Sequence, residues 1–122
     1  MPKILVIDDK EDNLVSMSAL LKLLIPGVFV MTARSGPEGI EKAGRELPDT
    51  ILLDIIMPEM DGLEACRRLK ESPLTGHIPI ILITAIKTDD ESRARGLECG
   101  ADGFLSKPVD FERLGRAPIP EI

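Results

Sequence analysis

The stretch ILLDIIMPEMDG, at residues 51–62, begins as an apolar run, changes at Asp54, and ends in an acidic turn that contains proline and glycine. A short run of this kind, rich in β-branched residues, is typical of a strand that is buried on both faces, as in a parallel sheet. Four other runs share this length and character. The five predicted strands are KILVI (3–7), VFVMTA (28–33), TILLD (50–54), IPIILIT (78–84) and GFLS (103–106).

Helices are expected between these strands. After the first strand, apolar residues from Leu14 to Leu24 keep helical spacing, and the sequence IPG at residues 25–27 ends that helix. Three later helices have a start signal, in which a capping side chain precedes by three residues a glutamate that can reach back to its amide. These pairs are Ser35 with Glu38, Asp61 with Glu64, and Thr88 with Glu91, and Gly100 is a suitable stop for the fourth helix.

The alternation of strands and helices predicts an α/β fold with a doubly wound, five-stranded parallel sheet. Parallel neighbours need right-handed crossovers, and helices must cover both faces of such a sheet. With 122 residues, of which 43% are hydrophobic, the chain has the length of one domain with an ordinary core. Residues 1–122 are therefore expected to form a single domain.

The composition also limits the possible partners. The formal net charge of -6 argues against a protein that coats nucleic acid or an anionic membrane. No apolar run approaches the ~18 residues of a membrane span, and the apolar part of the N-terminal sequence MPKILVIDD is too short for a signal peptide. The sequence thus predicts a soluble, cytoplasmic protein that binds neither membranes nor nucleic acid directly.

The two cysteines, Cys66 and Cys99, lack metal-ligand spacing. They are expected to be reduced, buried thiols rather than a disulfide scaffold.

Polar residues follow or close four of the predicted strands, and in a sheet of this type functional sites lie at the carboxyl ends of the strands. These residues are Asp8 and Asp9 after the first strand, Asp54 in the third, Thr84 in the fourth and Lys107 after the fifth. Three neighbouring carboxylates repel one another unless a cation neutralises them, and Mg²⁺, a hard ion that prefers oxygen ligands, suits such a cleft. A hydroxyl and an ammonium group can hold the oxygens of a phosphoryl group, and a carboxylate can accept that group covalently. Asp54 is the predicted acceptor.

Four motifs, in this order and spacing, resemble the bacterial response-regulator receiver domain. They are VIDDKEDN (6–13), ILLDIIMPEMDG (51–62), ILITA (81–85) and GADGFLSKP (100–108). The resemblance covers residues 3 to about 112, and the combination is specific although each motif alone is weak. It implies the flavodoxin-like strand order 2-1-3-4-5. It also implies a signalling phosphoacceptor of two-component phosphorelays rather than an enzyme.

The resemblance assigns a role to each residue of the predicted metal site. Asp54 corresponds to the phosphorylated aspartate, which also takes part in metal binding. Asp9 corresponds to a direct magnesium ligand and Asp8 to a ligand that acts through water. The backbone carbonyl of Ile56 would complete the protein's contacts with the metal.

The resemblance also implies how the phosphorylated state would be recognised inside the domain. Thr84 corresponds to the switch hydroxyl, Lys107 to the lysine that pairs with the phosphate, and Phe104 to the switch aromatic. The peptide bond between Lys107 and Pro108 corresponds to the family's cis peptide. The expected partners are a sensor histidine kinase or a phosphotransfer protein, and a downstream target.

Three other classes of function are open to a chain with this fold. A haloacid-dehalogenase-like phosphatase would have Asp-x-Asp after the first strand, where this chain has DDK at residues 8–10. A flavodoxin-like nucleotide-binding module would have a glycine- or hydroxyl-rich phosphate loop there, and DDKEDN repels phosphate in the absence of magnesium. A pseudo-receiver that docks without phosphorylation is the main alternative. Such a domain typically lacks one of the acceptor, acid, hydroxyl or lysine positions, and all of them are present here.

Two further predictions concern stability of the phosphate and assembly. Ile56 and Ile86 occupy the positions that influence phosphate lifetime in this family, and neither can orient an attacking water, so self-dephosphorylation should be slow. The resemblance fails in residues 113–122, where Gly115 and Pro118 limit a fifth helix to one or two turns. We therefore expect a shortened fifth helix. Because members of the family often pair through this helix, we also expect a monomer.

Overall fold

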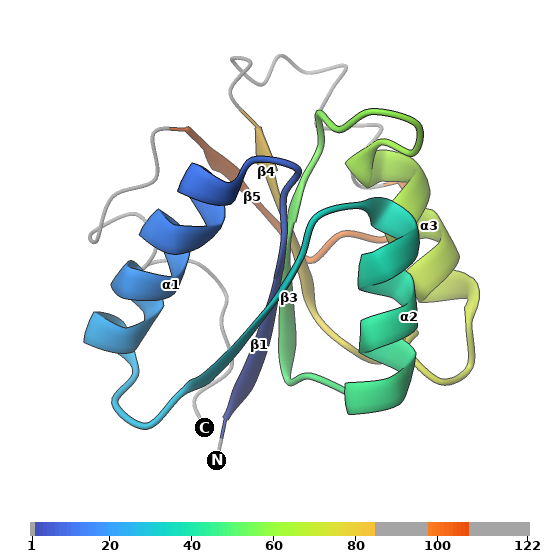
Figure 1. Ribbon diagram of the computed structural model, residues 1–122. Coiled ribbons are helices and arrows are strands. Elements are labelled where there is room, and N and C mark those ends of the chain that lie inside the picture. Colours follow the sequence, from blue (N-terminus) through green and yellow to red (C-terminus); the bar gives the residue numbers. More distant parts are fainter. Residues whose placement is uncertain (1, 85–97, 108–122) are drawn as a thin grey trace.

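The computed structural model describes residues 2–84 and 98–107 (Figure 1). Within these ranges five strands form one sheet, and every neighbouring pair is parallel. The strands are β1 (Lys3–Ile7), β2 (Phe29–Ala33), β3 (Thr50–Asp54), β4 (Ile80–Thr84) and β5 (Gly103–Ser106). Their order is β2-β1-β3-β4-β5, which confirms the predicted doubly wound α/β topology.

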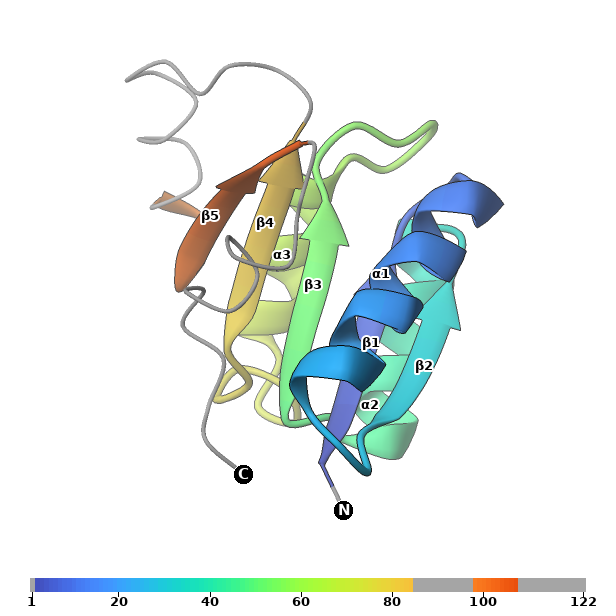
Figure 2. The ribbon, with the colours of Figure 1, turned by 90° about the vertical axis from the view of Figure 1, so that its left-hand side faces the viewer.

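Helices cover both faces of the sheet, as the alternating pattern predicts. Helix α1 (Glu11–Leu24) lies on one face, and α2 (Gly36–Glu46) and α3 (Gly62–Glu71) lie on the other (Figures 1 and 2). The predicted helix that starts at Thr88 and the shortened fifth helix fall outside the described residues. No helix in the described ranges is long and apolar enough to cross a membrane.

The sheet separates two apolar layers because side chains point alternately to its two faces. Ile4 and Val6 of β1 pack toward α1, while Leu5 and Ile7 pack toward α2 and α3. All residues of β3 and β4 are buried, as expected for central strands. Strand β2 differs from the prediction of burial on both faces, since Phe29 is 49% exposed. Among the described strands β2 lies at the edge of the sheet, with β1 as its one neighbour.

The predicted start signals of α2 and α3 are present as hydrogen bonds. The Ser35 hydroxyl accepts from the amide of Glu38 at 3.2 Å, and the Asp61 carboxylate accepts from the amide of Glu64 at 2.9 Å. The prediction also has each glutamate accept from the amide of its capping residue. At α2 Glu38 accepts instead from the amide of Arg34, one residue before the capping residue Ser35. At α3 the Glu64 carboxylate binds arginine side chains of its own helix instead. Each side-chain cap still satisfies one amide that the helix leaves free.

Helix α1 begins at Glu11, three residues before the apolar pattern that predicted it. Its capping residue is Lys10, whose side chain makes no capping hydrogen bond, so the sequence carries no start signal there. The acidic residues Glu11 and Asp12 in the first turn favour a helix start, because they lie near the positive end of the helix dipole. At the predicted stop before β5, Gly100 has φ +91°, a left-handed conformation that favours glycine.

Candidate functional site

The five parallel strands bring the predicted polar residues to one edge of the sheet. Asp8 follows β1, Asp54 ends β3, Thr84 ends β4, and Lys107 follows β5. Backbone hydrogen bonds extend beyond the strands and fix this edge. The amide of Lys107 donates to the Thr84 carbonyl at 2.7 Å, and the amide of Asp8 donates to the carbonyl of Ala33 at 3.0 Å. These hydrogen bonds fix the backbone positions from which the side chains of this edge extend.

Asp8, Asp9 and Asp54 form an acidic cluster. Each of them offers a carboxylate oxygen, and these oxygens lie within 4.8 Å of one another. Asp8 and Asp54 are each only 5% exposed, and Asp9 is half-buried. Backbone amides compensate part of the lost hydration, since Asp8 Oδ1 accepts from Lys10 at 3.0 Å and Asp54 Oδ1 accepts from Ile56 at 3.4 Å. Two buried acids so close together need positive charge to remain ionised.

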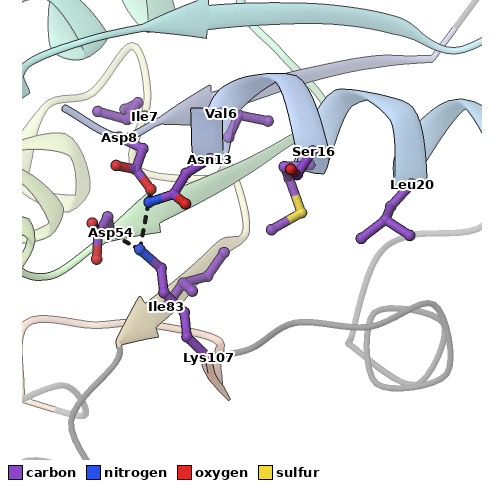
Figure 3. Close-up of a pocket in the computed structure, with 10 residues that line it drawn as sticks. Val6, Ile7, Asp8, Asn13, Ser16, Leu20, Asp54, Ile83 and Lys107 are labelled. Atoms are coloured by element: carbon purple, nitrogen blue, oxygen red, sulfur yellow. Dashed lines mark hydrogen bonds and ion pairs between the residues drawn. The ribbon is translucent and has the colours of Figure 1, made fainter. Parts of the chain in front are cut away.

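Lys107 supplies one positive charge to this cluster. Its Nζ lies 3.2 Å from Asp8 Oδ2 and 3.2 Å from Asp54 Oδ2, and Figure 3 shows the ammonium group directed at both carboxylates. Partial burial acts to lower the pKa of Lys107, but the carboxylates of Asp54 and Asp8 outweigh it, and the pKa is raised. Lys107 is therefore a charged bridge between the ends of β1 and β3.

One lysine does not neutralise the cluster. Burial raises the pKa of Asp54, the nearby Asp8 carboxylate raises it further, and the opposing effect of Lys107 is too small to reverse the shift. A raised pKa means that the ionised form of Asp54 is disfavoured at its present place. An additional cation at the cluster would therefore be stabilised by the carboxylates and would stabilise them in return.

The donor set and the space around it fit a hard divalent cation. A cavity of about 190 Å³ adjoins the cluster, and Asp9, Asp54, Ile56 and Lys107 are among the residues that line it. Carboxylate oxygens and a backbone carbonyl are ligands that Mg²⁺ prefers, and an open site leaves room for its waters. The arrangement thus fits the predicted magnesium site, with Lys107 on the border of the same cavity.

A second, larger cavity of about 500 Å³ extends from the acidic cluster along α1 (Figure 3). Asp8, Asp54 and Lys107 line one end, and Asn13 and Ser16 of α1 add polar groups to a lining that is otherwise apolar. Neither Asn13 nor Ser16 was among the residues predicted for the site. The available signal was their polarity in the first two turns of a helix that follows a strand ending in acidic residues.

Gly62 also contributes to the site, through the backbone. A Cβ atom at this position would lie 2.3 Å from the carbonyl oxygen of Asp54, far inside van der Waals contact. The amide of Gly62 donates to the carbonyl of Ile55 at 2.7 Å, so α3 begins directly against the loop that leaves Asp54. The loop itself includes Glu59 with φ +68°, an uncommon conformation for a residue other than glycine. The sequence indicates a helix cap at Asp61 and a motif that ends at Gly62, but a close backbone approach leaves no periodic signal.

The structure thus brings Asp8, Asp9, Asp54 and Lys107 together. Thr84 is buried at the end of β4. Phe104 is half-buried in β5 beside Leu82 and packs against the apolar layer under α2 and α3. Of the remaining sequence predictions, Ile86 and Pro108 lie outside the described residues.

Comparison with known proteins identifies the family. The sequence profile described as "Response regulator receiver domain" matches residues 4–117. Response regulator PleD of Caulobacter vibrioides is 49% identical over 108 residues, which are 88% of this chain and 23% of that protein. Protein PilH of Pseudomonas aeruginosa is 36% identical over 114 residues, which are 93% of this chain and 92% of PilH. The chain therefore spans less than a quarter of PleD but nearly all of PilH.

Solved structures agree with the sequence comparison. Chemotaxis protein CheY4 of Vibrio cholerae has a TM-score of 0.86 and 32% sequence identity, with 93% of this chain and 92% of that chain covered. The structure described as "BeF3 Activated DrrB Receiver Domain" has a TM-score of 0.81 and 34% identity, with 94% and 92% covered. The profile match over most of the chain, together with these relatives, shows that the chain belongs to the response-regulator receiver domain family.

Proposed function

We propose that the chain is a phosphoacceptor that receives a phosphoryl group on Asp54 from a phosphohistidine of a sensor histidine kinase or phosphotransfer protein. One observation carries the proposal: the Asp54 carboxylate lies in the acidic cluster and also contacts Lys107 at 3.2 Å. A nucleophilic carboxylate, a group of metal-binding oxygens and a phosphate-pairing ammonium therefore meet at one point. These are the groups that phosphoryl transfer to a carboxylate requires.

In the proposed reaction an oxygen of Asp54 attacks phosphorus, the new O–P bond forms, and the N–P bond of the phosphohistidine breaks. Asp8, Asp9, Asp54 and the carbonyl of Ile56 would hold Mg²⁺, which neutralises negative charge on the carboxylates and the phosphoryl oxygens when it is bound. The Lys107 ammonium would pair with a phosphoryl oxygen. It would then exchange its contact with Asp54 for a contact with the product, without leaving the site.

Phosphorylation would then be sensed by Thr84 and Phe104. The Thr84 hydroxyl would turn toward a phosphoryl oxygen, and Phe104 would occupy the space that Thr84 vacates. Such a change biases an equilibrium between two arrangements that exist before phosphorylation. The proposed role is signalling rather than catalysis on a separate substrate.

Incubation with a small-molecule phosphodonor and Mg²⁺, followed by intact mass measurement, tests the proposal. The protein should gain one phosphoryl group, and Asp54→Asn should gain none. Asp12→Asn is a matched control, because Asp12 is an exposed acid on α1 outside the acidic cluster and its variant should be labelled normally. Stoichiometric labelling of Asp54→Asn at another residue would show that the acceptor is assigned wrongly.

The alternative proposal, a pseudo-receiver that docks without phosphorylation, makes the opposite prediction in this assay. It predicts no mass gain in the parent protein at any magnesium concentration. Asp9→Ala separates the two proposals further. If Asp9 is a magnesium ligand, this variant should lose magnesium binding and labelling while its unfolding transition remains cooperative.

We further propose that residues 1–122 act as one receiver domain in the cytoplasm and that the isolated chain remains monomeric after activation. The proposal of a monomer rests on the sequence of residues 113–122, which limits a fifth helix. Light scattering on the beryllofluoride-activated protein tests it. A tight dimer whose interface maps to residues 102–116 would contradict the proposal.

A further inference from the structure

Cys66 and Cys99 form a thiol pair that takes no part in the proposed phosphoryl transfer. Cys66 lies in α3 and is fully buried, while Cys99 lies in the segment before β5 and is half-buried. This segment lies on the same face of the sheet as α3 (Figure 1). The Cys66 thiol donates to the backbone carbonyl of Cys99 at 3.5 Å. The Cys66 sulfur therefore lies against Cys99, at a contact between two residues that are 33 positions apart in the sequence.

The two thiols differ in chemical character. The hydrogen bond from Cys66, assisted by the backbone amides of Ala101 and Cys99, lowers the pKa of Cys99 to about 7 against the opposing effect of burial. The same contact and burial raise the pKa of Cys66. The contact therefore favours the thiolate, the nucleophilic form, at Cys99 and the protonated thiol at Cys66.

The two thiols also differ in access. Cys99 borders a surface cavity of about 390 Å³, which Asp61, Glu64, Arg67 and Glu98 also line. A small oxidant can therefore reach Cys99 without opening the fold. Cys66 lies behind it, in the apolar layer between α3 and the sheet. This order, an accessible thiol in front of a buried one, matches a pair in which one cysteine reacts and the other resolves the product.

We propose that Cys66 and Cys99 are a redox-modification site, at which a peroxide oxidises Cys99 and Cys66 then closes an intramolecular disulfide. In the first step Cys99 Sγ attacks a peroxide oxygen, an S–O bond forms and the O–O bond breaks. The departing hydroxide takes up the proton that Cys99 lost and leaves as water. In the second step Cys66 Sγ attacks Cys99 Sγ, the S–S bond forms, and the S–O bond breaks. The Cys66 proton leaves with that oxygen as a second water. Two thiols are oxidised and one peroxide is reduced.

The disulfide would join α3 to the segment that leads into β5. The closed loop contains all of β4, including Thr84 at its carboxyl end, and β5 continues from Cys99 toward Lys107. Oxidation would therefore restrain the two strands that supply the hydroxyl and the ammonium of the acidic site. A link across this sequence separation also removes conformational freedom from the unfolded chain.

The test is to treat the reduced, full chain with hydrogen peroxide, block remaining thiols with N-ethylmaleimide, and measure mass and melting temperature. We expect the loss of two hydrogen atoms, a Cys66–Cys99 peptide in a non-reducing digest, and a melting temperature raised by about 5 to 10 °C. Dithiothreitol should reverse all three changes. This result does not depend on phosphorylation, so it can fail while the proposed function stands.

Two variants distinguish the order of the steps. Cys99→Ser should leave Cys66 reduced at the same peroxide concentration, because Cys66 has no exposed surface. Cys66→Ala should stop at a sulfenic acid on Cys99, which dimedone captures. If Cys66→Ala does not fold, the parent protein and Cys99→Ser still decide the matter. Free thiols in the parent after treatment, a sulfinic acid on Cys99 without a crosslink, or disulfides only between molecules would overturn the proposal.

Discussion

Replacing Asp54 by asparagine should stabilise the metal-free protein, although it removes an ion pair. The substitution keeps the shape of the side chain and removes one charge from a group that is 5% exposed. The remaining amide oxygen can still accept from Lys107, which now lies 3.2 Å from Asp54 Oδ2. The hydrogen bond to the amide of Ile56 is long, at 3.4 Å, so its loss should matter little.

The sign of the effect follows from three contributions. At an effective dielectric constant of ~20, attraction to Lys107 at 3.2 Å stabilises ionised Asp54 by about 5 kcal/mol. Repulsion from Asp8, whose oxygen lies within 4.8 Å, costs about 3.5 kcal/mol on the same scale. Burial of the charge costs several kcal/mol more. Burial and repulsion together exceed the attraction, in agreement with the raised pKa of Asp54, and we expect a net gain of about 2 kcal/mol for the variant.

Urea unfolding at pH 7 in the presence of a chelator measures this gain. Asp12→Asn is the control and should lower the free energy of unfolding by less than about 1 kcal/mol, because it removes only a favourable charge at the start of α1. The advantage of Asp54→Asn should shrink as the pH falls through the raised pKa of Asp54 toward its unfolded value of 3.8. Below that window Asp54 is protonated in both states, and the parent no longer carries the penalty. A variant that is less stable than the parent by about 1 kcal/mol or more, which exceeds the usual effect of a surface substitution, would show that the Lys107 ion pair outweighs burial.

Four other variants test separate parts of the structure. Lys107→Met should lower the free energy of unfolding of the metal-free protein by about 3 kcal/mol, because two buried carboxylates lose their cation. Chemical denaturation should show that millimolar Mg²⁺ restores part of this loss. Gly62→Ala should cost about 2 kcal/mol in the same assay and slow labelling, since its Cβ would meet the backbone of Asp54. Thr50→Val should raise stability by about 1 kcal/mol, because among the described residues the buried Thr50 hydroxyl has no hydrogen-bond partner. Ile56→Asn combined with Ile86→Glu should speed release of phosphate by several fold, followed by intact mass after the phosphodonor is removed; an unchanged rate would refute the shielding argument.

The fold was predictable from the sequence because three of its strands are buried on both faces. Such strands appear as continuous apolar runs. The predicted ranges 3–7 and 50–54 coincide with β1 and β3, and the predicted range 78–84 contains β4. The start of α1 was not predictable in this way, because Lys10 provides no capping side chain. The exposure of Phe29 was missed because a run of apolar letters does not distinguish an edge strand from a central one.

The position of the candidate site was predictable for a topological reason. All strands of a parallel sheet end at the same edge, so acids after two strands and a lysine after a third must approach one another. The particular contacts were not predictable. That Lys107 bridges Asp8 and Asp54 depends on side-chain geometry, and that Cys66 faces Cys99 depends on how α3 packs against a segment 33 residues away.

The bridge formed by Lys107 has a consequence for the choice of ion. Counted over the described residues, three carboxylates and one ammonium leave the acidic cluster with an excess of two negative charges when every group is ionised. A divalent cation makes the cluster electroneutral. A monovalent cation leaves the cluster anionic, so it would repel an approaching phosphoryl donor. A trivalent cation leaves the cluster positive, so it would slow release of the phosphoryl group. Valence, before ionic radius, is therefore the first property by which this site would discriminate among metal ions.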